Sequence, residues 1–266
     1  MEETSVRTRK IPGGSLFPTR VEWGTRTQAK ALPVWPGRKT DVNRNPGIVW
    51  DDCYRRLPSD WKTRPLPQKA QDVCRFLSAT GVKKVLDVGC GVGRWSILFA
   101  RSGMKPVGVD VSETAIRLAK GWAAEEKLQV EFLVGSAQML PFSSEFFDAV
   151  VANSVIDHMD TTEARQAMEE VTRVLRLEGV LFVSFDGPNP EPPEHDTLPD
   201  GTWVLREPGR LGLKRRYYSD AEIRNLLAGF RIIDWHTTPS GDRWVYARKP
   251  GQGHTTVIET HSSPCA

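Results

Sequence analysis

The segment VLDVGCGVGRW, residues 85–95, constrains the fold of this chain more than any other. An apolar run meets an acid, Asp87, and is followed by glycines at positions 89, 91 and 93. Glycine has no Cβ atom, so it accepts left-handed backbone angles and lets main-chain N–H groups come close to a ligand. A strand, a glycine turn and a helix in this order therefore predict a loop that holds its backbone against a cofactor.

Loops of this kind are found in more than one class of cofactor-binding enzyme. One class, the dinucleotide-binding enzymes, has the spacing G-x-G-x-x-G. Here the spacing is G-x-G-x-G, with the third glycine one residue early. A glycine turn alone is a weak signal, so the residues downstream have to show which class of cofactor the chain binds.

Short apolar strands alternate with amphipathic helices through the middle of the chain. The periodicity predicts helices at residues 69–77, 93–100 and 162–175, another that Ser112 caps, and strands at residues 85–88, 107–109, 130–134, 149–151 and 180–185. This alternation indicates an α/β fold, in which helices cover both faces of a mostly parallel sheet. Ligands bind such sheets beyond the carboxyl ends of the strands, where the glycine loop falls.

The two ends of the chain differ from this middle part. Residues 1–48 carry nine Lys/Arg against four Asp/Glu, a net charge of +5, whereas the whole chain carries only +3. They are rich in Pro, Gly, Arg and Thr and show no apolar periodicity, which predicts a flexible basic arm. The arm is either a solvated or transit-like leader or a tether for nucleic acid or a membrane. Residues 250–266 are predicted to form a flexible tail.

The segment after the fifth predicted strand changes in character. Residues 186–216 are Pro-rich and irregular, and loops of this length are usually functional or disordered. Ser219 and Glu222 then have the spacing of a helix capping box. Residues 230–235 and 244–248, joined by a turn, are predicted to form a pair of strands.

No metal site or membrane segment is indicated. His195 and its acidic neighbours follow no known metal-ligand spacing, so we interpret them as a solvated loop. The four cysteines form no C-x-x-C pair, which suggests free thiols in a reducing compartment. No apolar run approaches the roughly 18 residues that a membrane helix needs, so a cytoplasmic location is expected.

Asp110 ends the second predicted strand. A carboxylate at this place can accept hydrogen bonds from both hydroxyls of a ribose. The alternative is an acid that caps the next helix, because Ser112 and Glu113 follow directly. The glycine loop upstream favours ribose binding.

The chain resembles the class I S-adenosylmethionine-dependent methyltransferases. The matching pieces are VLDVGCGVGRW, GVDVSETAIRLA, GSAQMLPF, FDAVVANSVIDHM and VLRLEGVLFVSF, in family order across roughly residues 66–249. The resemblance implies a methyltransferase domain at residues 49–249, with 186–216 as a substrate-side insertion. It also implies a Rossmann-like, doubly wound sheet of seven strands, mostly parallel with an antiparallel last strand, and S-adenosylmethionine as cofactor.

The resemblance also implies which residues bind the cofactor. Those of the glycine motif are Asp87, Gly89, Cys90, Gly91 and Gly93, of which 89–91 pass the methionine part. Asp110 would bind the ribose, Val111 would lie beside the adenine, Ser136, Ala137 and Gln138 would meet the adenine edge, and Asn153 and Ser154 would lie near the sulfonium. One departure concerns Ser136, because many relatives have an aspartate there, and a serine gives the adenine amino group a weaker contact.

A looser likeness concerns WDDCYRRLPSDW, residues 50–61. It resembles a WDxxY segment of tellurite-resistance and thiopurine-type methyltransferases, which folds over the cofactor. Trp50, Tyr54 and Trp61 would then form an aromatic lid, and aromatic faces suit a sulfonium cation. The alternative is that these aromatic residues anchor the amino-terminal arm by packing.

The expected reaction is an in-line transfer of a methyl group to an oxygen, nitrogen or sulfur of a small molecule. Alignment of the reactants accounts for much of such a rate. His158 is the candidate base, although it could instead order its loop or pack against the cofactor. The alternatives are an RNA or protein methyltransferase that uses the basic arm, a non-catalytic cofactor-binding protein and, against the glycine spacing, an NAD(P)-dependent oxidoreductase.

Overall fold

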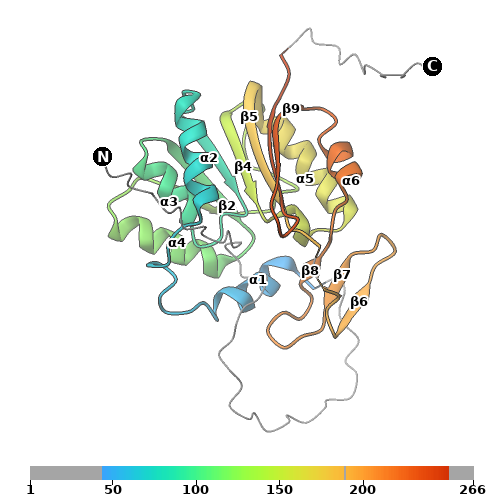
Figure 1. Ribbon diagram of the computed structural model, residues 1–266. Coiled ribbons are helices and arrows are strands. Elements are labelled where there is room, and N and C mark those ends of the chain that lie inside the picture. The colour runs from blue at the N-terminus through green and yellow to red at the C-terminus, as the bar shows by residue number, and fades with distance from the viewer. Residues whose placement is uncertain (1–43, 189, 252–266) are drawn as a thin grey trace, which may run out of the picture.

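The computed structural model describes residues 44–188 and 190–251. At its centre lies a seven-stranded sheet in the order β3-β2-β1-β4-β5-β10-β9 (Figure 1). The strands of this sheet are β1 (Lys84–Val88), β2 (Lys105–Asp110), β3 (Glu131–Val134), β4 (Phe147–Asn153), β5 (Leu175–Phe185), β9 (Arg231–Thr237) and β10 (Arg243–Arg248).

The first five strands of the sheet run parallel to one another. β1 pairs with β2 and β4, β2 pairs with β3, and β4 pairs with β5, all in parallel. β10 is antiparallel to both β5 and β9. The predicted mostly parallel sheet with an antiparallel last strand is therefore confirmed, and the carboxyl ends of β1 to β5 meet at one edge.

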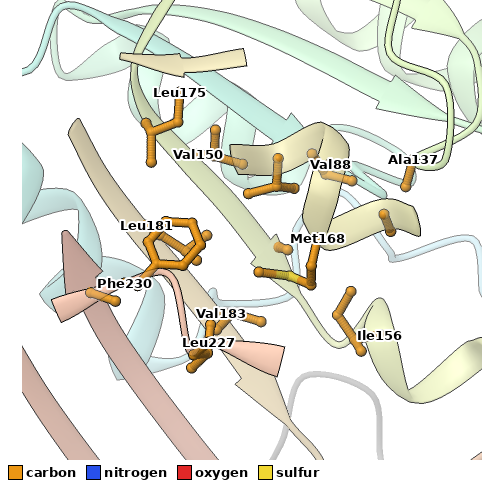
Figure 2. Packing of buried hydrophobic residues seen from close by; sticks show 14 of the residues in the cluster. Val88, Ala137, Val150, Ile156, Met168, Leu175, Leu181, Val183, Leu227 and Phe230 are labelled. Carbon is orange, nitrogen blue, oxygen red and sulfur yellow. The ribbon is translucent and has the colours of Figure 1, made fainter. Parts of the chain in front are cut away.

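Helices cover both faces of the sheet (Figure 1). On one face lie α2 (Gln68–Ala79), α3 (Arg94–Arg101) and α4 (Glu113–Glu125), and on the other lie α5 (Thr161–Val174) and α6 (Asp220–Leu226). Figure 2 shows Met168 of α5 and Leu227 packed with Val150 and Leu181 of the sheet. Each such side chain contributes about 1.5–3 kcal/mol by leaving water, which keeps the strand ends in fixed positions.

The predicted helix caps are confirmed. Ser112 Oγ accepts a hydrogen bond from the backbone N–H of Ala115 over 3.0 Å at the start of α4. Ser219 and Glu222 form the reciprocal capping box at the start of α6. A second capping box, between Asp160 and Glu163, starts α5 and was not predicted.

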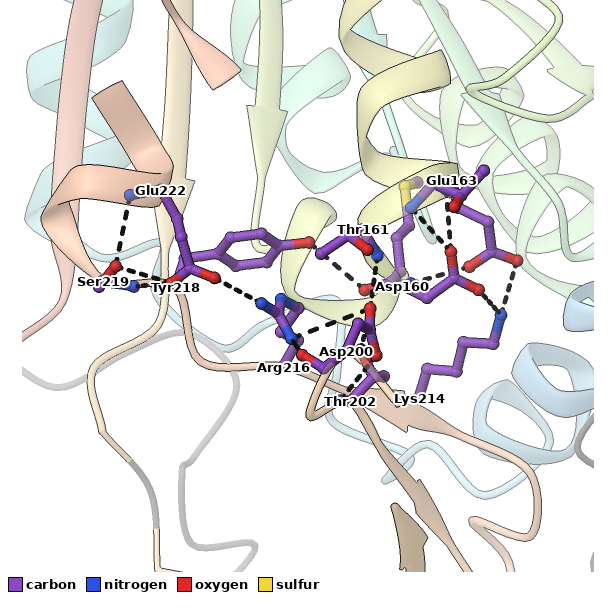
Figure 3. A network of polar contacts seen from close by, with 12 residues as sticks. Asp160, Thr161, Glu163, Asp200, Thr202, Lys214, Arg216, Tyr218, Ser219 and Glu222 are labelled. Carbon is purple, nitrogen blue, oxygen red and sulfur yellow. Dashed lines mark hydrogen bonds and ion pairs between the residues drawn. The ribbon is translucent and has the colours of Figure 1, made fainter. Parts of the chain in front are cut away.

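The prediction that residues 186–216 are irregular was wrong. This segment contains a small antiparallel sheet of β6 (His195–Thr197), β7 (Trp203–Leu205) and β8 (Lys214–Arg215). Polar contacts fix it to the main domain (Figure 3). The Arg216 guanidinium pairs with Glu222 of α6, and the Thr161 N–H donates to Asp200 over 2.8 Å.

One further helix, α1 (Pro46–Tyr54), precedes the sheet and lies across its carboxyl edge. Asn45 caps it, so ordered structure begins within the predicted arm of residues 1–48. The rest of that arm, residues 1–43, and the predicted tail from residue 252 onward lie outside the described residues. Within the part of the chain that the structure describes, no helix is long and apolar enough to cross a membrane.

Candidate active site

The glycine loop joins β1 to α3 in backbone conformations that other residues rarely adopt. Gly89 has a φ of +64° and Gly91 a φ of +53°. A Cβ atom on Gly89 would lie 2.5 Å from Cγ2 of Val155, and one on Gly91 would lie 2.5 Å from the hydroxyl oxygen of Tyr54. Both the backbone angles and the lack of space therefore require glycine at these two positions.

A cleft opens above this loop, where the carboxyl ends of β1, β2 and β4 meet. The residues predicted from the sequence that line it are Trp50, Tyr54, Gly89, Asp110, Val111, Ser136, Ala137, Gln138, Asn153, Ser154 and His158. The structure thus brings residues from across more than a hundred positions of the chain into one site. Four others that were predicted to bind the cofactor do not line the cleft: Asp87, Cys90, Gly91 and Gly93.

Asp87 and Cys90 support the loop instead. The Ser96 hydroxyl of α3 donates to Asp87 Oδ2 over 2.6 Å, which ties β1 to the first turn of α3. Burial raises the pKa of Asp87 to about 7. The Cys90 N–H donates to the Val109 carbonyl over 3.0 Å, so the loop is also joined to β2.

Asp110 stands at the end of β2 with its carboxylate held in place. Its Oδ2 accepts from the Gly91 N–H over 2.8 Å, and its Oδ1 accepts from the Ser112 N–H over 2.9 Å. The residue is 7% exposed, and burial raises its pKa to about 6 against the lowering effect of these two hydrogen bonds. Each carboxylate oxygen can accept a second hydrogen bond, which leaves two acceptor positions for a ligand.

Ser136 and Gln138 follow β3 on the wall of the cleft next to Asp110, whose backbone carbonyl accepts from the Gly135 N–H over 2.9 Å. The Ser136 hydroxyl donates to Gln138 Oε1, and it accepts from the Gln138 N–H over 3.2 Å. The serine that replaces the usual acid is therefore already paired with its neighbour. The amide nitrogen of Gln138 remains as a donor on this wall.

Asn153 ends β4, and Ser154 follows it in an unusual conformation. Ser154 has a φ of +52°, which is uncommon for a residue other than glycine. Its N–H donates to Ser184 Oγ over 2.9 Å, and that hydroxyl donates to Asn153 Oδ1 over 3.2 Å. These bonds across β4 and β5 hold the strained turn in place, as is common where a backbone is shaped for function.

Helix α1 and the insertion together form the roof of the cleft. Trp50 and Tyr54 line it from α1, and Leu213 and Lys214 line it from the end of the insertion. Val49 joins the two parts by packing against Leu213. The looser likeness predicted a lid of Trp50, Tyr54 and Trp61, and the first two do line this cleft. Trp61 does not, because its ring packs edge-on against Trp122 of α4 with centroids 5.3 Å apart.

A carboxylate of α1 docks the roof on the domain. Asp51 Oδ1 accepts from the Ser112 hydroxyl and from the Thr114 N–H, the latter over 2.9 Å, at the start of α4. Despite burial, these hydrogen bonds lower the pKa of Asp51. The acid thus caps α4 from outside at Ser112, which is two positions along the chain from Asp110, and places α1 beside the wall that Asp110 forms.

His158 lies in η1 (Ile156–His158) and faces the roof. Its Nδ1 lies 2.9 Å from the carbonyl oxygen of Lys214, and its ring meets that of Trp50 edge-on with centroids 4.8 Å apart. A carbonyl oxygen only accepts, so Nδ1 carries the proton and Nε2 carries the lone pair. Burial lowers the pKa of His158, which keeps the imidazole neutral.

Some residues of the cleft were not predicted. Lys214 Nζ pairs with Asp160 over 2.8 Å and with Glu163 over 2.7 Å, and both Lys214 and Glu163 line the cleft (Figure 3). The spacing of Asp160 and Glu163 is a capping-box signal that is present in the sequence. Nothing local in the sequence shows that a lysine more than fifty positions away joins them.

The described residues of the insertion form no arrangement suited to a metal. His195 Nδ1 lies 2.9 Å from the Pro192 carbonyl, and Nε2 lies 3.4 Å from Glu191. Among the residues that the structure describes, no three His, Cys, Asp or Glu side chains are grouped so as to hold an ion.

Comparison with known proteins identifies the family. Residues 85–179 match the family model described as a methyltransferase domain. Over 189 residues the chain is 33% identical to O-methyltransferase rstn1 of Aspergillus nomiae. The matched region is 66% of this chain and 79% of that protein. The chain belongs to the class I S-adenosylmethionine-dependent methyltransferases. S-adenosylmethionine is accordingly its cofactor.

Two further relatives agree with this membership. The uncharacterized methyltransferase YcgJ of Bacillus subtilis is 29% identical over 164 residues, which are 61% of this methyltransferase and 64% of that relative. A solved structure of an S-adenosylmethionine-dependent methyltransferase from Methanosarcina mazei superposes with a TM-score of 0.55 at 26% identity, over 63% of this chain and 92% of that one. The chain therefore spans less than two thirds of the length of the Bacillus relative.

Proposed function

We propose that this methyltransferase transfers the methyl group of S-adenosylmethionine to a hydroxyl oxygen of a small molecule, with His158 as the base. One observation carries the proposal. A neutral imidazole, whose Nδ1 proton is held by the Lys214 carbonyl, lies in the same cleft as Asp110 and the glycine loop. The relative rstn1, which is named an O-methyltransferase, supports oxygen as the acceptor atom.

The residues of the cleft fit the cofactor. Asp110 keeps two acceptor positions after its backbone hydrogen bonds, which suits the two hydroxyls of a ribose. Gly89 has no side chain to block the methionine part. Val111 and Ala137 supply apolar walls for the adenine, and Gln138 supplies an amide for its edge.

Asn153, Ser154 and Trp50 surround the other end of the cleft, where the sulfonium would lie. The aromatic face of Trp50 favours a cation and, with Tyr54, excludes water. Tyr54 itself is buried against Gly91. The roof would thus hold the reacting groups away from solvent.

Methyl transfer requires few other groups from the protein. The bound cofactor supplies an electrophilic methyl group and leaves as a neutral thioether. Alignment alone can supply roughly 7–11 kcal/mol of the barrier reduction. A hydroxyl acceptor must also lose its proton. His158 lines the cleft, and the lone pair on its Nε2 can accept this proton.

Two measurements on the purified chain test this proposal. Calorimetric titration with S-adenosylhomocysteine and NAD should show micromolar affinity for the first and none for the second. Formation of S-adenosylhomocysteine should then be measured with matched panels of phenols, amines and thiols. Turnover confined to the phenols would support an oxygen acceptor, whereas turnover confined to amines or thiols would contradict it.

A further inference from the structure

Lys69, in the first turn of α2, is buried without a polar partner. It is 6% exposed, and among the described residues its ammonium group makes no hydrogen bond or ion pair. Its Nζ lies over the ring of Trp244, 5.0 Å from the centroid. Burying an ammonium group is costly unless it is paired, so this position calls for an anionic partner.

Carboxylates surround Lys69 without contacting it. Asp186, Asp242 and Asp157 all raise the pKa of Lys69, although burial, which is the larger effect, lowers it to about 8. Asp242 is already paired, since its Oδ1 accepts from the Gly187 N–H over 2.7 Å and its Oδ2 accepts from Ser240. Asp242 therefore stabilises the turn between β9 and β10.

Two further polar groups near this place lack a partner. Asp157 is 1% exposed, and its Oδ1 accepts no hydrogen bond among the described residues. The indole N–H of Trp244, whose ring lies under Lys69, is also buried and has no hydrogen-bond partner among the described residues. A buried cation, a buried carboxyl and a free N–H form a site with polar groups left for a ligand.

A chain of hydrogen bonds joins this polar site to the cofactor cleft. The hydroxyl of Ser154, which lines the cleft, donates to Asp186 Oδ1 over 3.3 Å. The Asp186 N–H in turn donates to Asp157 Oδ2 over 3.1 Å. The site therefore lies behind the wall where the sulfonium end of the cofactor is proposed to bind.

We propose that Lys69 binds the carboxylate of the amino-acid end of S-adenosylmethionine, while Asp186 faces its ammonium group. The charges match, because a zwitterionic amino acid presents one group of each sign, and Lys69 and Asp186 are the groups of opposite sign that face them. The proposal rests on the proposed function, since it requires the same cofactor in the same cleft. It assigns to α2 a role that its amphipathic pattern does not suggest.

The test compares two nucleoside ligands. S-Adenosylhomocysteine carries the amino-acid end, whereas 5′-methylthioadenosine has the same adenosine thioether without it. Affinities of both are measured by calorimetry for the wild-type chain, Lys69→Met and Asp186→Asn. The control is Lys105→Met, because Lys105 is exposed at the opposite edge of the sheet, at the start of β2.

Lys69→Met should weaken S-adenosylhomocysteine binding about 10- to 100-fold, the usual effect of losing a charge-assisted hydrogen bond. Binding of 5′-methylthioadenosine should stay within about twofold of the wild type, and the control should bind both ligands normally. Thermal melting shows whether each variant is folded.

Equal effects of Lys69→Met on both ligands, or no effect on either, would overturn the proposal while the wild type still binds S-adenosylhomocysteine. A wild-type chain that binds neither ligand would instead remove the proposed function, and this inference with it.

Discussion

The Nδ1 atom of His158 lies 2.9 Å from the carbonyl oxygen of Lys214, which joins the loop after β4 to the insertion. The same lysine pairs through Nζ with Asp160 and Glu163 at the start of α5. The insertion thus fixes the tautomer of the candidate base and its own position through one residue. A wall built in this way keeps the imidazole of His158 oriented, because Lys214 belongs to β8 of the small sheet in the insertion.

Replacement of His158 by glutamine should lower turnover about 100-fold or more, because the acceptor then loses its proton without a positioned base. Affinity for S-adenosylhomocysteine should change little. Since burial lowers the pKa of His158, the base form persists below the usual value of 6.5, and the acidic fall in kcat should lie below that pH. The fall should vanish in the variant.

The control for this experiment is His236→Gln, because His236 is exposed on β9. It should leave both turnover and the pH profile of kcat unchanged. Equal losses of turnover and of cofactor affinity in His158→Gln would show that the histidine packs against the cofactor and does not act as a base.

Asp110→Asn should reduce affinity for S-adenosylhomocysteine about 100-fold, because one acceptor position for the ribose is replaced by a donor. The pKa of Asp110 is raised to about 6, so wild-type affinity should also fall as the pH drops below 6 and the carboxylate is protonated. Calorimetry at pH 5 and pH 8 measures both effects. Asp60→Asn, at an exposed position, is the control. Unchanged affinity in Asp110→Asn would contradict the ribose contact.

Much of the sheet and of the glycine loop followed from local patterns. Apolar runs bounded by glycine and helix caps such as Ser112 are short-range signals, and they placed β1 to β5 correctly. Asp110 was found because it ends a strand at a fixed distance after the loop. Each of these depends on neighbours within about twenty residues.

Other parts of the site depend on contacts that no local pattern encodes. Strands β6 to β8 have two or three residues each, too short for an alternation to be seen. The partners of Lys214 and the docking of Asp51 on α4 arise only when distant segments meet. Lys69 is a partial exception, because it lies four residues before Val73 and so falls on the buried face of α2.

Asp87→Asn should make the free energy of unfolding less dependent on pH. The pKa of Asp87 is about 7 in the folded chain against 3.8 as its ordinary value, so the folded state keeps a proton that the unfolded state loses. Its contribution to stability is full below about pH 4 and is lost as the pH rises to 7. Asparagine keeps the bond from Ser96 without this loss.

The expected difference between wild type and Asp87→Asn grows by up to about 4 kcal/mol between pH 4 and pH 8, in favour of the variant. Urea unfolding at several pH values measures it. Asp60→Asn, at an exposed position before α2, should run parallel to the wild type. A constant difference between wild type and Asp87→Asn would mean that Asp87 is ionised in the folded chain.

Gly91→Ala should destabilise the chain more than Gly81→Ala. Both glycines have a positive φ, +53° and +73°, so an alanine at either position strains the backbone by about 1 kcal/mol. Only at Gly91 does the new Cβ also meet another group, the Tyr54 hydroxyl at 2.5 Å, whereas nothing lies within 4 Å at Gly81. Gly81→Ala therefore measures the strain alone.

The double variant Gly91→Ala/Tyr54→Phe separates the two causes. Removal of the hydroxyl leaves the nearest ring atom at 3.2 Å, so the double variant should regain about 1 kcal/mol relative to the sum of the single changes. Thermal or urea unfolding gives all four values. Strict additivity would mean that α1 does not pack on the glycine loop as described. Coupling would show in solution that the roof of the cleft rests directly on the glycine loop.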